Sequence, residues 1–260
     1  MHVRRREEYV TDFTSKIVVV TGAGVGIGRA AAIAFAQHGA AVVINSLSTS
    51  GRAVCDFIQE NGQSSIFVQA DVSRNEGAKQ VIEEAVRQYG GLDVLVNVAG
   101  IVVSGSVEDC TEEEWDQSMA TNAKSVFLTS KYALPELRKS KGTIVNITST
   151  VSIKGVTNRA AYSATKGAVL ALSKSMAAEY AAEGIRVNCV CPGTVLTPSL
   201  LSRIREEPDP DQALKKYIAR QPMGRLGDPE EIAQAILFAA SPDVSFMTGA
   251  NIVVDGAMSV

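Results

Sequence analysis

Short apolar runs alternate with longer amphipathic stretches along almost the whole chain. Seven runs rich in valine and isoleucine predict strands, at residues 16–20, 41–45, 65–70, 92–98, 142–148, 185–190 and 251–255. Their cores are apolar at consecutive positions, which is typical of strands covered on both faces of a sheet. Six stretches with helical spacing lie between them, at residues 26–38, 51–61, 75–89, 111–138, 161–183 and 229–240. The alternation predicts an α/β fold with a doubly wound parallel sheet of seven strands.

Two of the predicted helices carry start signals. Thr111 and Glu114 have the spacing of a capping box, in which each side chain satisfies a backbone N–H at the start of the helix. Pro229 stands where a first helical residue tolerates the missing N–H. These signals support the boundaries read from the apolar spacing.

One segment interrupts the rhythm of strands and helices. Residues 197–224 form a long insertion, in which Pro208 and Pro210 exclude a single continuous helix. An insertion beyond the carboxyl end of a strand lies where α/β proteins bind ligands, so we expect a lid on the substrate side. The alternative is a surface excursion that packs against a partner subunit.

The composition describes one globular domain. The 260 residues contain no repeat and no linker rich in proline, glycine or serine, so we expect an N-terminal tail at residues 1–15 and a single domain at residues 16–260. The net charge of −3 argues against nucleic acid or an anionic membrane as a partner. No apolar run approaches the length of a membrane span.

The cysteines and histidines limit the chemistry. Four cysteines match neither a metal-site spacing nor a disulfide framework, which predicts reduced thiols in a cytoplasm. The chain has two histidines, His2 in the tail and His38 near a predicted helix end. We therefore expect no bound metal and no catalytic triad that depends on histidine.

A glycine-rich turn follows the first predicted strand. In "TGAGVGIG", Gly22, Gly26 and Gly28 lead from the strand at residues 16–20 into the next helix. Glycines allow a tight turn and a close approach of the backbone to a pyrophosphate, which the N-terminus of the helix attracts. This position within an alternating chain indicates a dinucleotide site.

The spacing T-G-x-x-x-G-x-G resembles that of the short-chain dehydrogenase/reductase family, and further motifs of that family follow in order. They are Asp71-Val72, "NVAG" at residues 97–100, Asn122, Ser149, Tyr162-x-x-x-Lys166 and "PGTVLT" at residues 192–197. Val98 replaces the second asparagine of the family's N-N-A-G motif. The resemblance covers residues 16–256 and implies a Rossmann-type NAD(P)-binding catalytic domain.

The resemblance also implies which residues bind the cofactor and which carry the reaction. The expected cofactor contacts are Gly22, Gly26, Ile27, Gly28, Ser46, Asp71, Val72, Asn97, Ala99, Gly100, Tyr162, Lys166, Pro192, Gly193, Val195 and Thr197. The expected catalytic residues are Asn122, Ser149, Tyr162 and Lys166. By resemblance, Lys166 also holds the nicotinamide ribose and Asn122 positions a water in a proton relay.

The Tyr162–Lys166 pair has a chemical rationale of its own. A free tyrosine has a pKa of about 10, and a cation within about 4–6 Å can lower that value by about 1–3. Lys166 lies one helical turn from Tyr162, so we expect it to lower the pKa of Tyr162. Tyr162 then exchanges a proton with an alcohol or ketone, while Ser149 hydrogen-bonds the same oxygen.

The residues after the second strand favour NADP(H) over NAD(H). Folds that prefer NAD usually place an acidic residue about 20 residues past the glycines, where it binds the ribose diol. No acid occurs between Gly28 and Asp56, and Ser46 is followed by more hydroxyls and by Arg52. NAD(H) remains the alternative.

Two arginines suggest an acidic substrate. Arg159 precedes Tyr162 by three residues, and Arg220 ends the insertion at residues 197–224. An arginine pair suits a carboxylate through bidentate hydrogen bonds, as in family members that act on hydroxy acids or sugar acids. In the alternative interpretation, Arg159 is an exposed turn charge and Arg220 pairs with the acidic stretch at residues 206–211.

The predicted function is an NAD(P)-dependent oxidoreductase that interconverts a secondary alcohol and a ketone, with Tyr162 as acid and base, on a small-molecule substrate that is a hydroxy acid or derived from a sugar. The alternatives are a 3-oxoacyl-[acyl-carrier-protein] reductase, which shares these motifs, and a catalytically silent nicotinamide-binding regulatory protein. The resemblance also implies a homotetramer, formed through the helices at residues 111–138 and 161–183 and through the C-terminal segment.

Overall fold

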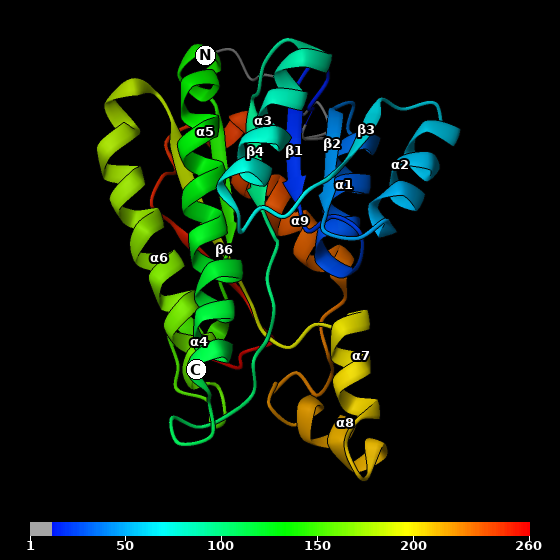
Figure 1. The fold of residues 1–260 in the computed structure, drawn as a ribbon, viewed down its shortest axis with the longest axis vertical. Coiled ribbons are helices and arrows are strands. Elements are labelled where there is room, and N and C mark those ends of the chain that lie inside the picture. Colours follow the sequence, from blue (N-terminus) through cyan, green and yellow to red (C-terminus); the bar gives the residue numbers. More distant parts are fainter. Residues whose placement is uncertain (1–11) are drawn as a thin grey trace, which may run out of the picture.

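The computed structural model describes residues 12–260, and its strands form one parallel sheet in the order β3-β2-β1-β4-β5-β6-β7 (Figure 1). The seven strands of these residues are β1 (Ile17–Thr21), β2 (Ala41–Ser46), β3 (Ser65–Gln69), β4 (Val94–Asn97), β5 (Thr143–Ile147), β6 (Arg186–Pro192) and β7 (Asn251–Val254). Every neighbouring pair is parallel. The winding reverses between β1 and β4, and a crevice opens at the carboxyl ends of such strands. The predicted fold class is confirmed.

Nine helices in these residues cover the sheet or project beyond it. They are α1 (Gly26–Gln37), α2 (Ser50–Glu60), α3 (Asn75–Tyr89), α4 (Glu112–Met119), α5 (Ser125–Ser140), α6 (Ala160–Tyr180), α7 (Pro198–Arg205), α8 (Pro210–Ile218) and α9 (Pro229–Ala240). The capping box of Thr111 and Glu114 starts α4, and Pro229 is the first residue of α9, as predicted.

Each face of the sheet carries its own apolar core. Helices α1, α2 and α9 bury Phe35, Ile58 and Ile236 against one face. Helices α3, α5 and α6 cover the other face, where Leu137 and Ile185 are fully buried. Because both faces are covered, the strands are apolar at consecutive positions rather than at alternate ones.

The folded body begins earlier in the chain than the sequence pattern indicated. Phe13, which we assigned to the N-terminal tail, is 1% exposed and packs edge-on against Phe35, with ring centroids 4.8 Å apart. Its backbone N–H also donates to the carbonyl of His38. A single aromatic residue ahead of a strand has no periodicity, so the pattern could not reveal this anchor. Residues 1–11 of the predicted tail lie outside the described residues.

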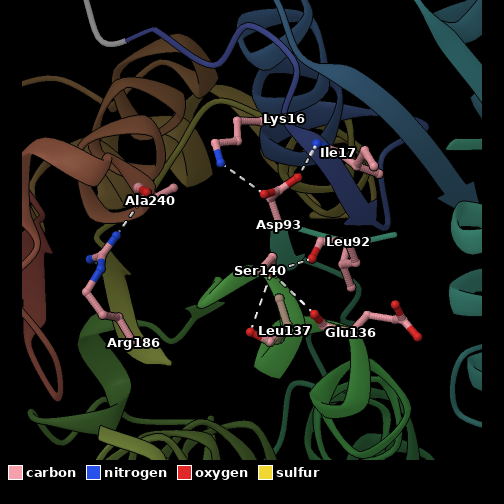
Figure 2. Close-up of polar contacts among 9 residues, drawn as sticks. All are labelled: Lys16, Ile17, Leu92, Asp93, Glu136, Leu137, Ser140, Arg186 and Ala240. Carbon is pink, nitrogen blue, oxygen red and sulfur yellow. Dashed lines mark hydrogen bonds and ion pairs between the residues drawn. The ribbon is translucent and has the colours of Figure 1, made fainter. Parts of the chain in front are cut away.

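Polar contacts fasten the amino ends of the strands (Figure 2). The carboxylate of Asp93 accepts from Lys16 Nζ at 3.0 Å and from the backbone N–H of Ile17 at 2.9 Å, which joins the start of β1 to the start of β4. The guanidinium of Arg186 donates to the carbonyls at the end of α9, including that of Ala240 at 3.0 Å. These contacts hold the amino ends of the strands in place. The residues of the predicted site lie at the opposite, carboxyl ends of the strands.

The helix predicted at residues 111–138 is interrupted. A π-helical turn at Ala120–Lys124 separates α4 from α5, and Asn122 lies within it. Such a turn accommodates one residue more than an α-helical turn, and it is frequent at functional sites. Apolar spacing does not reveal one extra residue, because the helix continues on both sides with the same buried face.

The insertion at residues 197–224 forms two short helices, α7 and α8, that project away from the sheet (yellow in Figure 1). Pro210 starts α8, so the prolines divide the segment as predicted. The two helices bury a small apolar cluster of their own, made of Leu200, Ile204, Ala213 and Tyr217.

Candidate active site

A cavity of about 1080 Å³ lies along the carboxyl ends of the strands. It extends from the glycine turn after β1 to the two helices of the insertion. All but two of the residues predicted for the site line it. Those that do are Gly22, Gly26, Ile27, Gly28, Ser46, Asp71, Val72, Ala99, Gly100, Ser149, Arg159, Tyr162, Lys166, Pro192, Gly193, Val195, Thr197 and Arg220. The two exceptions are Asn97 and Asn122.

The glycine turn fits a dinucleotide pyrophosphate. A Cβ on Gly28 would lie 2.3 Å from the carbonyl oxygen of Gly22, so glycine alone allows this packing of α1 on the turn. Gly26 has a φ of +56°, which favours glycine. The residue before α1, Val25, gives the helix no side-chain cap, so its first N–H groups face the cavity without a polar side chain. A bound phosphate would satisfy them.

The expected adenosine end of the cavity is lined by serine hydroxyls, at the place where NAD-preferring folds usually carry an acidic residue. Ser46 donates its hydroxyl to the carbonyl of Ser48 at 2.6 Å and accepts from the N–H of Gly51. No acidic residue lies in this loop. Arg52, which the sequence suggested as a phosphate ligand, stacks over the ring of Phe67 and does not line the cavity. Arg74 does line it.

Tyr162, Ser149 and Lys166 meet at the other end of the cavity. Ser149 follows β5, and its hydroxyl accepts from the backbone N–H of Val151 at 3.4 Å and lines the same part of the cavity as Tyr162. Tyr162 and Lys166 lie on one face of α6, and the ammonium of Lys166 is 5.9 Å from the centre of the Tyr162 ring. Lys166 donates to the carbonyl of Ile147 at 2.7 Å. The three side chains that we expect to act on one oxygen therefore share one pocket wall.

The electrostatics of Tyr162 differ from the expectation. Burial raises the pKa of Tyr162, and the hydrogen bond of Ser149 and the positive charges of Arg203 and Arg159 oppose this rise. The ammonium of Lys166 is itself buried and donates to the backbone carbonyl of Ile147. Burial lowers the pKa of Lys166 to about 8. The arginines are therefore further positive charges that favour the phenolate, beyond the lysine singled out by the sequence.

Neither asparagine faces the cavity with its side chain. Asn97 donates to Asn146 at 2.9 Å and accepts from Thr129, in a buried chain of polar groups between β4, β5 and α5. Asn122 exchanges two hydrogen bonds with the backbone of Ile101, through its Oδ1 at 2.7 Å and its Nδ2 at 2.9 Å. Both Nδ2 protons of Asn122 and one acceptor site of its Oδ1 therefore have protein partners.

Three arginines line the cavity near Tyr162. Arg159 is 8% exposed and donates to Ser104 at 3.0 Å, and Arg220 stacks over the ring of Tyr217 at 4.4 Å. Arg203, which the sequence pattern did not single out, comes from α7. No ion pair within the described part of the chain involves any of the three.

Arg203 had a readable signal in the sequence. Leu200 and Ile204 are the buried positions of a short amphipathic helix that begins at Pro198. A residue three positions after Leu200 lies beside that apolar stripe. The spacing thus marks Arg203 as a residue beside the buried face of the helix, and in the structure it lines the cavity.

Among residues 12–260, no group of three or more histidine, cysteine, aspartate or glutamate side chains is arranged to hold a metal ion. None of the helices described is both long and apolar enough to cross a membrane.

The comparisons agree with this fold. A family model described as "Enoyl-(Acyl carrier protein) reductase" matches residues 22–259. The chain belongs to the short-chain dehydrogenase/reductase family, whose dehydrogenases use nicotinamide cofactors. It is an oxidoreductase that acts on alcohol or ketone groups, which confirms the predicted class of enzyme.

Relatives and solved structures support the assignment over nearly the whole chain. The chain is 45% identical to an "Uncharacterized oxidoreductase" of Thermotoga maritima, over 94% of this chain and 98% of the relative. It is 40% identical to a 2-keto-3-deoxy-L-fuconate dehydrogenase of Xanthomonas campestris, over 96% and 82% of the two chains. The structure of Thermoplasma acidophilum aldohexose dehydrogenase superposes with a TM-score of 0.87 at 34% identity and covers 96% of each chain.

Proposed function

We propose that this enzyme interconverts a secondary alcohol and a ketone on a hydroxy acid or a sugar-derived acid, with NADP(H) as the preferred cofactor. The observation that carries the proposal is the set of three arginines without acidic partners beside Tyr162. Buried and half-buried cations need counter-charges, and the described residues supply none to these three arginines. A substrate carboxylate would supply that charge.

Tyr162 is the proton-transfer group of the proposed reaction. In oxidation its phenolate accepts the proton of the substrate hydroxyl, and in reduction its phenol returns a proton to the ketone oxygen. Ser149 donates a hydrogen bond to the same oxygen as negative charge develops there. Lys166 holds the nicotinamide ribose, and Asn122 fixes the loop at Gly100–Ile101. A nicotinamide bound in this cavity would supply the hydride chemistry, with hydride acceptance in oxidation and hydride donation in reduction.

The arginines orient the substrate for this step. The carboxylate binds between Arg159 at the start of α6 and the pair Arg203 and Arg220 of the insertion, and the carbinol carbon then faces Tyr162. Because two of the arginines come from the insertion, substrate binding draws α7 and α8 toward the cavity, as expected for a lid. The name of one relative, 2-keto-3-deoxy-L-fuconate dehydrogenase, specifies a sugar acid and supports this interpretation.

A spectrophotometric NAD(P)H panel tests the reaction and the substrate class together. We expect turnover with hydroxy acids or sugar acids, and no turnover by Tyr162→Phe, which still binds the cofactor. Activity confined to an acetoacetyl thioester would instead identify a 3-oxoacyl-[acyl-carrier-protein] reductase. Activity confined to neutral sugars would remove the carboxylate from the proposal.

Substitution of Arg159 tests the role of the arginines. Loss of a hydrogen bond to a charged group costs about 1.5–3 kcal/mol, so Arg159→Met should lower kcat/KM for an acidic substrate by roughly 10- to 100-fold. The matched control is the methyl ester of the same substrate, for which the change should stay within about twofold. An equal loss for acid and ester would show that Arg159 only supports the fold.

The NADP preference rests on the hydroxyl-rich loop after β2, which offers Ser46 and Ser48 and no carboxylate to the adenosine ribose. Comparison of kcat/KM for NADPH and NADH decides it. We expect a preference for NADPH, which Arg74→Ala should weaken because that arginine lines the same end of the cavity. A strong preference for NADH would refute this part of the proposal.

We also propose that the enzyme is a cytoplasmic homotetramer. Trp115 on α4 and Phe127 on α5 are 43% and 49% exposed, and Val253 on β7 is 43% exposed. These apolar side chains lie on the elements that we expect to form subunit contacts, and its four cysteines are all free thiols. Light scattering after gel filtration measures the assembly, and Phe127→Asp should reduce the molar mass.

A further inference from the structure

We propose that Thr165 is a positioning residue. Through the amide of Asn122, it holds α6, which carries Tyr162 and Lys166, in a fixed position relative to the loop at Gly100–Ile101. The inference rests on the proposed function for its kinetic consequences and on the contacts of Thr165 for its geometry. Thr165 lies between the two active-site residues on α6 and is fully buried.

The hydroxyl of Thr165 makes two hydrogen bonds in opposite directions. It donates to the carbonyl of Tyr162 at 2.8 Å, one turn earlier in α6. It accepts from Nδ2 of Asn122 at 3.0 Å, across the interface between α6 and the π-helical turn. Because its single proton is given to Tyr162, Thr165 can only accept from Asn122.

This acceptor determines how the Asn122 amide is oriented. One Nδ2 proton goes to the carbonyl of Ile101, the other goes to Thr165, and Oδ1 accepts the Ile101 N–H. The next oxygen, Ser118 Oγ, is farther from Nδ2, at 3.4 Å. Thr165 thus completes the set of partners that holds Asn122 in place.

The contacts connect two walls of the cavity. Ile101 follows Gly100, and a Cβ on Gly100 would lie 3.1 Å from Oδ1 of Asn122 and 3.7 Å from Nζ of Lys166. The loop therefore runs directly beside the ammonium of Lys166. A shift of α6 relative to this loop would move Tyr162 and Lys166 relative to the cofactor groove.

Thr165→Val removes the hydroxyl and keeps the shape of the side chain. It leaves one buried Nδ2 proton of Asn122 without its partner and the Tyr162 carbonyl without its second donor. We expect kcat to fall about tenfold while KM for substrate and cofactor changes less than about twofold. Thr165→Ser keeps the hydroxyl and should restore kcat to within about twofold of the wild type.

The chain contains a matched control on the same helix. Ser173 donates to the carbonyl of Val169 at 2.7 Å and accepts from the buried amide of Asn146 at 2.8 Å, so it repeats the Thr165 arrangement two turns farther along α6. It does not line the cavity. Ser173→Ala should lower the melting temperature at least as much as Thr165→Val and leave kcat unchanged.

Hydrogen exchange gives a readout that does not depend on activity. The Ile101 amide donates to Asn122, so it should exchange at least about tenfold faster in Thr165→Val than in the wild type or in Ser173→Ala. Faster exchange in Thr165→Val, together with no turnover by the wild type, would support the positioning role of Thr165 and refute the proposed function. Unchanged exchange and unchanged kcat in Thr165→Val would overturn the inference, as would equal losses of kcat in Thr165→Val and Ser173→Ala. If Thr165→Val does not fold, Thr165→Ala carries the same tests.

Discussion

The most direct test of the cofactor end of the cavity is the substitution Gly28→Ala. Gly28 lies in the first turn of α1, where a Cβ would stand 2.3 Å from the carbonyl oxygen and 2.8 Å from the carbonyl carbon of Gly22. Both atoms belong to the backbone, so no side chain can rotate away to make room. The new methyl group must push the turn after β1 and the start of α1 apart.

The size of the effect follows from these distances. Real Cβ contacts essentially never fall below 3.0 Å, so the turn must open by roughly 0.7 Å. Overpacking of this kind costs about 1–3 kcal/mol of folding stability. It also moves the N–H groups of Gly22 and α1 away from each other, and a displacement near 1 Å can cost about 100-fold in a positioned interaction. We therefore expect the Kd for NADPH to rise at least about tenfold.

Titration of NADPH fluorescence measures the affinity, and urea unfolding measures the stability of the same preparations. Gly167→Ala is the matched control, because Gly167 lies in α6 with an ordinary helical φ, and a Cβ added there would meet no atom within 4 Å. Alanine should stabilise that helix interior by about 0.5–1 kcal/mol and leave the Kd unchanged. A folded Gly28→Ala enzyme that binds NADPH within about twofold of the wild type would refute the assignment of the pyrophosphate to this turn.

Two further expectations concern stability. Phe13→Ala should cost about 3–5 kcal/mol in urea unfolding, because it empties a fully buried site against Phe35, and a loss below about 1 kcal/mol would place Phe13 outside the core. The folded-state pKa of Lys166, about 8, lies below the value of 10.5 for a free lysine, so the unfolded chain binds more protons between these values. The free energy of unfolding should therefore rise with pH between about 8 and 10.5, by up to ~1.4 kcal/mol per pH unit relative to Lys166→Met, and a difference that is constant with pH would contradict this burial. The raised pKa of Tyr162 acts in the opposite direction above pH 10, which limits the useful window to pH 8–10.

The sequence predicted the sheet well because a buried parallel strand is recognisable by itself. Runs such as residues 16–20 and 185–190 are apolar at consecutive positions, and a few residues decide each of them. The cavity lining was predictable for a related reason. In a parallel sheet the carboxyl ends of all strands lie on the same side. Polar residues and glycines that follow successive strands therefore meet there.

The remaining features depend on contacts between distant segments. Phe13 is part of the core only because Phe35 comes to lie beside it, and no local pattern marks that pairing. The buried partners of Asn97 and Asn122 likewise come from other elements, so the sequence could not show that these amides point away from the cavity. The pKa of Tyr162 is set by burial and by Arg203 of the insertion, which a local Tyr–Lys spacing does not reveal.

The two ends of the insertion meet on the body of the protein. Val195 pairs with Gly227, and the backbone N–H of Leu196 donates to the carbonyl of Gly227 at 2.8 Å. With its closed base and its own apolar cluster, the segment forms a small structural module on the body of the protein. Two of the three arginines travel with that module, whereas Ser149, Tyr162 and Lys166 stay with the sheet and α6. If the arginines bind the substrate as proposed, replacement of this short stretch of chain should change the substrate range without a change to the groups proposed to transfer the proton.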